Sequence, residues 1–106
     1  MGRARPRPGR AASLAEYRVF ETEGFVADLK RIARAAGPRV EAKLRTHVYP
    51  QLRREPQFGP AVKRLRTWTP DTRRVRIRDW RFFYQLDERE RLILMIAADH
   101  RREAHE

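Results

Sequence analysis

The chain has 106 residues and carries 25 Lys and Arg against 14 Asp and Glu, with no cysteine. This is the length of one small domain, because domains usually hold about 100–200 residues, and the lack of cysteine excludes a disulfide scaffold, thiolate metal sites and a thiol nucleophile. The formal net charge of +11 predicts a polyanionic partner, either a nucleic acid or an acidic protein.

The first thirteen residues differ in composition from the rest of the chain. Met1–Ser13 contains four arginines, two prolines and no acidic residue. The segment has no apolar periodicity, so burial cannot offset the entropy that ordering it would cost. We therefore expect a disordered basic arm over residues 1–13 and a single folded domain over residues 14–106.

A short strand and two helices are predicted after this arm. Tyr17–Phe20 is rich in the bulky and β-branched residues that are typical of a strand. Thr22 is a suitable N-cap for a helix whose apolar residues recur at spacings of three and four, and Gly37-Pro38 ends it. A second helix begins after Pro38, and Pro50 should end or kink it. Two helices joined by Gly-Pro indicate a helical hairpin laid across a sheet.

Four strands are predicted in the second half of the chain: Val62–Leu65, Arg73–Ile77, Trp80–Leu86 and Leu92–Ala98. Leu92–Ala98 is apolar on both faces, as in a central strand that is covered on both sides. This longest apolar run is far shorter than the ~18 residues that a membrane-spanning helix needs, so no membrane partner is expected. The predicted element order is β, α, α, β, β, β, β. We predict an α+β fold in which two N-terminal helices, arranged as a hairpin, pack on a small antiparallel β-sheet.

Basic residues concentrate along the predicted strands. Val75 and Ile77 are expected to face one way and Arg74, Arg76 and Arg78 the other. These arginines would lie about 6–7 Å apart, which is close to the phosphate spacing of an extended single strand. A solvated face that discourages edge pairing would show the same alternation. The net charge of +6 over residues 58–86 favours a phosphate-binding surface. Its candidate residues are Lys63, Arg74, Arg76, Arg78 and Arg81.

A second cluster near the C-terminus contains His100, Arg101, Arg102 and His105. Histidine is the side chain whose pKa lies nearest neutrality, and a neighbouring arginine can stabilise developing negative charge, so the cluster could take part in catalysis. The alternative interpretation is a solvated C-terminal tail without a catalytic role. No histidine pair has metal-ligand spacing and no carboxylates cluster, so we expect metal-free chemistry without a cofactor. Trp68 and Trp80 either stack on nucleobases or anchor the core and loops.

Three segments, taken in order, resemble the RelE/ParE superfamily of toxins from bacterial and archaeal type II toxin–antitoxin pairs. They are Val62–Arg66, Arg74–Tyr84 and Asp99–His105, and a Tyr-Pro-Gln-Leu link precedes them. The resemblance runs from about Tyr17 to Glu106. It implies the family's fold, two N-terminal helices packed on an antiparallel sheet, which agrees with the pattern of the residues.

The RelE-like branch of the family implies a metal-free endoribonuclease that cuts mRNA on the ribosome through 2′-hydroxyl attack and a cyclic phosphate. By position, the resemblance makes Arg81 and Arg101 phosphate stabilisers, His105 an acid or base, and Arg74 and Arg76 substrate anchors. It further implies a cognate acidic antitoxin, a toxin–antitoxin hetero-oligomer, and mRNA and ribosome as targets. The expected compartment is the cytoplasm.

Two departures from the family pattern bear on this function. Arg78-Asp79-Trp80-Arg81 replaces a common Gly-Asp-Tyr-Arg turn, and arginine replaces lysine at the basic pair. Arginine is a poor proton shuttle because its pKa exceeds ~12, which moves the general-base role toward His105 or His100. Two alternatives stay open. One is the ParE-like branch, which shares the fold and inhibits DNA gyrase, and the other is a nucleic-acid-binding relative that lacks toxicity.

Overall fold

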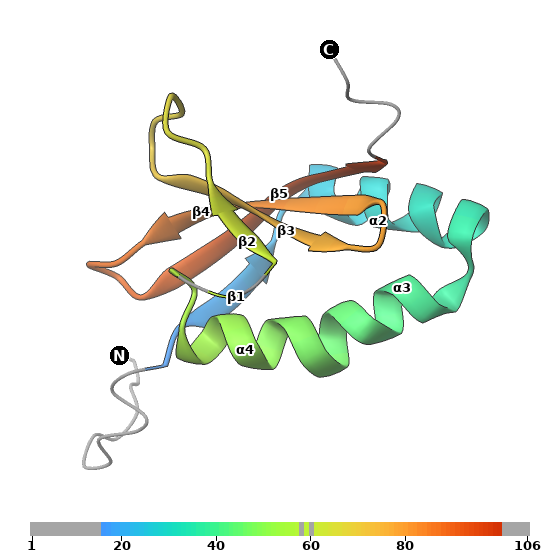
Figure 1. The fold of residues 1–106 in the computed structure, drawn as a ribbon, viewed down its shortest axis with the longest axis horizontal. Coiled ribbons are helices and arrows are strands. Elements are labelled where there is room, and N and C mark those ends of the chain that lie inside the picture. The colour runs from blue at the N-terminus through green and yellow to red at the C-terminus, as the bar shows by residue number, and fades with distance from the viewer. Residues whose placement is uncertain (1–15, 58, 60, 101–106) are drawn as a thin grey trace.

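The computed structural model describes residues 16–57, 59 and 61–100 (Figure 1). The predicted arm over residues 1–13, and the site candidates Arg101, Arg102 and His105, lie outside the described residues. In chain order the elements are β1 (Arg18–Glu21), α2 (Glu23–Ala36), α3 (Pro38–Lys43), the π-helical turn η1 (Leu44–Val48), α4 (Tyr49–Arg54), β2 (Val62–Arg64), β3 (Thr72–Ile77), β4 (Trp80–Asp87) and β5 (Leu92–His100). The predicted order of strands and helices is confirmed.

The sheet differs from the predicted one in its strand directions. It has five strands in the order β1-β5-β4-β3-β2, with β1 parallel to β5 and the other pairs antiparallel. The prediction of two N-terminal helices on a small antiparallel sheet is therefore wrong, because the sheet is mixed and the helices follow β1. Side chains alternate with a period of two in either direction, so the residues of β1 do not reveal the direction of its neighbour.

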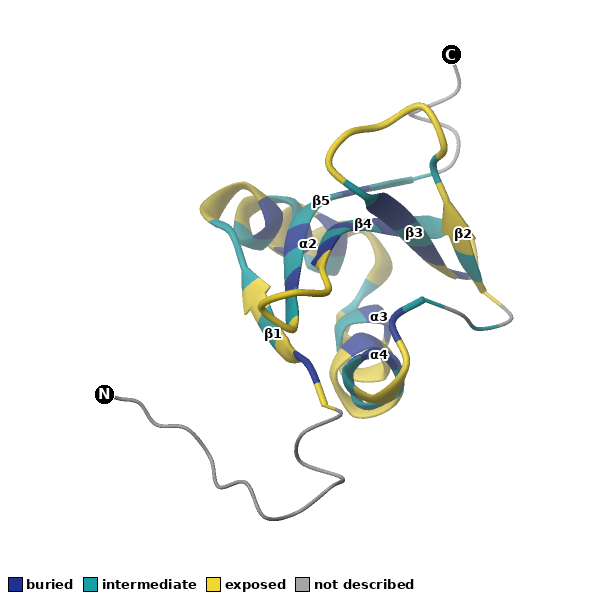
Figure 2. Cartoon of the chain, turned by 90° about the vertical axis from the view of Figure 1, so that its left-hand side faces the viewer, coloured by how far each residue is buried: buried dark blue, intermediate teal, exposed yellow. Residues whose placement is uncertain are grey.

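The helices cover one face of the sheet (Figure 2). As predicted, Thr22 caps α2: its Oγ1 accepts a hydrogen bond from the Phe25 backbone N–H at 3.2 Å. The buried face of α2 carries Phe25, Leu29 and Ile32, and the Phe25 ring lies 6.2 Å from that of Phe82 on β4. In the part of the chain that the structure describes, no helix is long and apolar enough to cross a membrane.

The second helix passes through Pro50 instead of ending there. Proline lacks an N–H, and its ring crowds the carbonyl group four residues earlier, which breaks a regular α-helix. Here the misfit is absorbed by η1, a wider turn in which the Tyr49 N–H donates to the Leu44 carbonyl. The helix then continues to Arg54 and buries Leu52 against the core.

The two faces of the sheet have different environments. The inner face, which packs on the helices, carries the buried side chains Val75, Ile77, Phe82, Tyr84, Leu86, Ile93, Met95 and Ala98. On the outer face of β5, Leu92 and Leu94 are half-buried. The described helices pack on the inner face, and the β2–β3 loop contacts the outer face where Trp68 stacks on Phe83. Leu92 and Leu94 stay half-buried, so the prediction that β5 is covered on both sides is wrong. We call this second face the outer face.

The turn between β3 and β4 contains a strained residue. Arg78 has a φ of 56°, in the left-handed region where a side chain costs about 1–2 kcal/mol and glycine costs much less. We expect Arg78→Gly to raise the free energy of unfolding by about 1 kcal/mol, and the thermal midpoint by about 4–8 °C for a domain of this size. Arg78→Ala is the matched control, because it removes the same charge but keeps the strain. Equal midpoints for the two variants would contradict this explanation.

Candidate functional site

Four basic side chains gather on the outer face of β2, β3 and β4. Lys63 lies directly opposite Arg74 in the ladder, and Arg76 lies directly opposite Arg81. Residues that face each other across antiparallel strands have Cα atoms about 4.5–5.5 Å apart, with their side chains on the same face. We call these four residues, Lys63, Arg74, Arg76 and Arg81, the basic cluster. The alternation of the sequence predicted this arrangement for Arg74 and Arg76.

Arg74 is a half-buried member of the basic cluster. Its Nε atom is buried and makes no hydrogen bond with any residue that the structure describes. Burial, followed by the charges of Arg76 and Arg81, lowers the pKa of Arg74, whereas Asp99 opposes the shift. Like charges that face each other across a sheet destabilise it. An anion bound on this face would therefore relieve a repulsion that the folded chain sustains without it.

Arg81 is held in one orientation by Asp99 on β5. Its Nε and Nη2 donate to Asp99 Oδ1 and Oδ2 at 3.0 and 3.3 Å, in a bidentate pair that is mostly shielded from solvent. The Arg81 guanidinium also lies 5.6 Å from the centre of the Phe83 ring, within the range of a cation–π contact. A guanidinium held at two points loses little freedom when it binds a phosphate.

A β-bulge places Asp99 beside Arg81. Phe83 pairs with Ala97 and Tyr84 pairs with Met95, so Ile96 has no partner on β4. This extra residue reverses the alternation of β5, and Asp99 reaches the outer face instead of the core. A carboxylate of α2 stabilises the bulged strand, because Asp28 Oδ2 accepts a hydrogen bond from the Ala98 N–H at 2.9 Å. The sequence analysis assigned no role to Asp99 or Phe83, and the sequence pattern contains no signal for the bulge.

Two predicted site residues lie away from the basic cluster. Arg78, in the β3–β4 turn, lines a cavity of about 410 Å³ on the helix side together with Arg39, Lys43 and Trp80. His100 contacts the Trp80 ring edge-on, with 4.6 Å between the ring centres. It follows Asp99 directly in β5, so its side chain leaves the opposite face of the sheet. The structure thus assembles Lys63, Arg74, Arg76 and Arg81, and it does not bring Arg78 or His100 to them.

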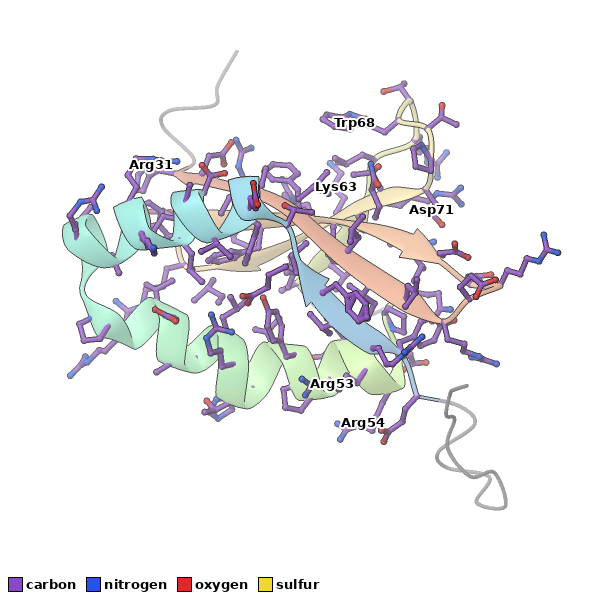
Figure 3. The ribbon with its side chains drawn as sticks, turned by 180° about the vertical axis from the view of Figure 1, so that it is seen from behind. Arg31, Arg53, Arg54, Lys63, Trp68 and Asp71 are labelled. Atoms are coloured by element: carbon purple, nitrogen blue, oxygen red, sulfur yellow. The ribbon has the colours of Figure 1, made fainter. Side chains whose placement is uncertain are left out.

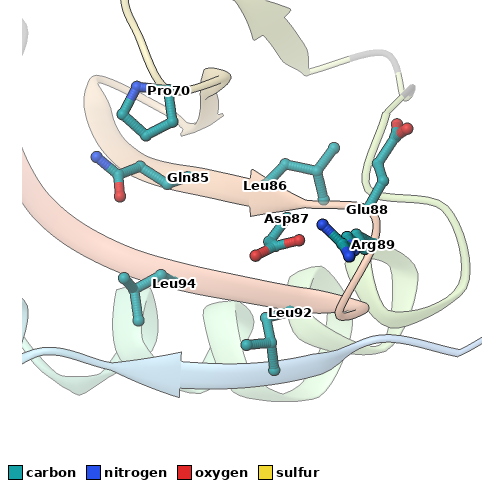
Figure 4. Close-up of a pocket in the computed structure, with 8 residues that line it drawn as sticks. All are labelled: Pro70, Gln85, Leu86, Asp87, Glu88, Arg89, Leu92 and Leu94. Atoms are coloured by element: carbon teal, nitrogen blue, oxygen red, sulfur yellow. The ribbon is translucent and has the colours of Figure 1, made fainter.

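The opposite end of the outer face has a different chemistry (Figure 4). A cavity of about 400 Å³ lies there, lined by Pro70, Gln85, Leu86, Asp87, Glu88, Arg89, Leu92 and Leu94. Leu92 and Leu94 give it an apolar floor, and its rim carries both signs of charge. No member of the basic cluster lines it. Within the described ranges, no group of three or more His, Asp or Glu side chains is placed to hold a metal ion.

The family of the chain follows from comparison with known proteins. The family model described as the ParE toxin of the type II toxin–antitoxin system, parDE, matches residues 19–105. The chain belongs to this family. The RelE/ParE resemblance predicted from the sequence is confirmed, and the protein is a toxin of a type II toxin–antitoxin system. No curated protein matches the sequence of the toxin.

Solved structures show the same fold. The toxin is 26% identical to a chain of the toxin–antitoxin complex RelBE2 from Mycobacterium tuberculosis, with a TM-score of 0.64 over 81% of this chain and 99% of that one. A mutant of the E. coli toxin RelE in the free state is 20% identical, with a TM-score of 0.62 over 84% and 87% of the two chains. A chain of the archaeal RelE–RelB complex from Pyrococcus horikoshii is 23% identical, with a TM-score of 0.57 over 84% of this chain and 99% of that one. At these lower identities the last two structures show the fold alone.

Proposed function

We propose that the toxin is a metal-free endoribonuclease that cleaves mRNA on the ribosome, as in the RelE-like branch of the family. The observation that carries this proposal is the gathering of Lys63, Arg74, Arg76 and Arg81 on one face of the sheet, where Asp99 pairs with Arg81. In this part of the described structure positive charge exceeds negative charge, and the excess lies on an open sheet face. RNA cleavage requires such an excess, because the pentacovalent phosphorane carries more negative charge than the phosphodiester.

The reaction is an intramolecular phosphoryl transfer. The 2′-oxygen of one nucleotide bonds to the adjacent phosphorus, the bond from phosphorus to the 5′-oxygen breaks, and the products carry a cyclic phosphate and a 5′-hydroxyl. A base accepts the 2′-hydroxyl proton, and an acid protonates the leaving 5′-oxygen. In this proposal Arg81 stabilises the phosphorane, while Arg74, Arg76 and Lys63 hold flanking phosphates.

The proton-transfer groups are assigned from the family resemblance. We propose His105 as acid or base, Arg101 as a second stabilising cation and Arg102 as a further phosphate contact; all three lie outside the described residues. None of the cluster's arginines is a suitable base, because a guanidinium stays protonated at neutral pH. His100 is less suitable than His105 because it packs against Trp80.

Inhibition of DNA gyrase is the second candidate function. The observation that favours it is the family model, which describes the ParE toxin and matches residues 19–105. In that case the outer face contacts a protein, and no phosphodiester bond is cleaved by the toxin. The excess positive charge of the basic cluster has no separate role under this function.

A cognate antitoxin is the proposed protein partner. The M. tuberculosis RelBE2 and P. horikoshii RelE–RelB structures are complexes of this kind. We propose that an acidic antitoxin forms a hetero-oligomer with the toxin and lies over the basic cluster, where its carboxylates neutralise the charge. Its apolar side chains would cover the half-buried leucines of β5.

The two functions are separated by one paired experiment. After induction of the toxin, primer extension on cellular mRNA is expected to reveal discrete cleavage sites with 5′-hydroxyl ends, while purified toxin leaves the supercoiling activity of gyrase unchanged. Intact mRNA together with inhibited supercoiling would contradict the ribonuclease and support the ParE-like function. Intact mRNA with active gyrase would support the non-toxic nucleic-acid-binding relative.

A further inference from the structure

Trp68 is a large aromatic side chain that the fold keeps exposed. It lies in the loop between β2 and β3, on the far side of the sheet from α4 (Figure 3), and 52% of its surface is accessible. A turn of the loop fixes the backbone at this residue, because the Trp68 backbone N–H donates to the Leu65 carbonyl at 3.0 Å. Its indole stacks on Phe83, with 6.5 Å between ring centres and 16° between ring planes. Offset stacking of this kind orders an aromatic pair.

The stacked pair joins the basic cluster. Phe83 lies directly opposite Arg74 in the β3–β4 ladder, and the Arg81 guanidinium lies 5.6 Å from the centre of its ring. Trp68 therefore extends the cluster with an ordered aromatic surface. Phe20 is the other exposed large apolar residue of the described chain. It lies opposite Leu94 on the β1–β5 side of the sheet, away from the cluster.

We propose that Trp68 is a base-stacking residue for single-stranded RNA: one nucleobase packs on the exposed indole while a neighbouring phosphate binds Arg74 and Arg76. Proteins that bind single strands combine a cationic track with aromatic rings, because every base presents a π-face whatever its sequence. The site deepens the ribonuclease proposed above and rests on it. Stacking fixes the position of one nucleotide relative to Arg81, so Trp68 acts as a positioning residue.

The test measures binding of a labelled single-stranded RNA of about ten nucleotides, within the usual range of site sizes. Trp68→Ala is expected to weaken affinity about 10- to 100-fold, and Trp68→Phe should restore most of it, because one aromatic face remains. The slope of log affinity against log salt should stay the same, because no phosphate contact is lost. Phe20→Ala is the matched control, and its affinity should equal that of the wild type.

An abasic version of the same RNA separates stacking from charge. The wild type should bind it as weakly as Trp68→Ala binds the normal RNA, and the variant should not distinguish the two RNAs. Equal affinities of wild type and Trp68→Ala would overturn the proposal. A lower salt slope in Trp68→Ala would also overturn it, because the loss would then come from the arginines. Inhibition of gyrase that depends on Trp68, with RNA affinity unchanged, would overturn it in favour of a protein contact.

These outcomes differ from those that test the ribonuclease. If the RNA binds through Trp68 but is not cleaved on ribosomes, the stacking site stands and the ribonuclease fails. If the wild type cleaves and Trp68→Ala cleaves and binds equally well, the ribonuclease stands and the stacking site fails. Thermal midpoints of all variants should stay within a few degrees of the wild type, because Trp68 and Phe20 are both exposed and substitutions at such sites usually change stability by about 0.5 kcal/mol or less.

Discussion

Replacement of Arg81 by alanine is expected to lower the rate of mRNA cleavage about 100- to 1000-fold. Loss of one preoriented donor to a developing oxyanion has an effect of this size. The substitution also leaves the Asp99 carboxylate without its bidentate partner, and its negative charge then offsets part of the charge of Arg74 and Arg76. Both consequences disfavour a phosphorane. Primer extension on ribosome-bound mRNA, at equal toxin concentrations, measures the effect, and relief of growth arrest should accompany it.

Arg64→Ala is the matched control for Arg81→Ala. Arg64 lies on β2, its side chain is 59% exposed, and its Nε is 3.6 Å from Asp71. Loss of this arginine removes the same charge from the same sheet but leaves the basic cluster intact, so cleavage should stay close to the wild-type rate. Arg81→Lys keeps the charge without the bidentate geometry and should fall between the two. A wild-type cleavage rate in Arg81→Ala would show that Arg81 does not contact the reacting phosphate.

Replacement of Arg73 by alanine is expected to lower the free energy of unfolding by about 3 kcal/mol. Arg73 is 8% exposed, and its guanidinium donates to both oxygens of Asp71, at 3.1 and 3.0 Å, and to the Gln57 carbonyl at 2.8 Å. Alanine leaves these acceptors without their donor in a shielded site, which costs about 3–5 kcal/mol when both partners are buried. Asp71 retains some solvent and a longer contact with Arg64, so we expect the lower end of this range.

Chemical denaturation measures the stability effect, and RNA binding separates it from function. Arg64→Ala should change stability by less than about 0.5 kcal/mol, as is usual for an exposed ion pair. Arg73→Ala should keep the wild-type affinity for single-stranded RNA at a temperature where it is folded, because Arg73 lies on the inner face. If Arg73→Ala is as stable as the wild type, or if the folded variant loses affinity for RNA, the purely structural role assigned to Arg73 is contradicted.

Arg73 and Arg74 illustrate how far sequence reasoning reaches. They are adjacent and chemically identical, and the period-two alternation of a strand places them on opposite faces. The pattern therefore predicted that Arg74 and Arg76 share a face. It failed for Arg78, because the strand ends at Ile77 and Arg78 adopts a φ of 56° in the turn, where alternation no longer applies.

The residues of the chain by themselves determined the order of the elements, the cap of α2, the buried stripe of each helix and the basic face of β3. All of these depend on local conformation and on short periodic patterns. The tertiary structure decided the remainder. The parallel pairing of β1 with β5 depends on how distant segments meet, the π turn at Pro50 on continued burial of Leu52, and the position of Asp99 on one unpaired residue in β5. The pairing of β1 and the bulge in β5 are set by strands far away in the sequence, which leave no trace in the local pattern. Pro50 does mark where the helix is disturbed, but the burial of Leu52 in the core decides that the helix continues.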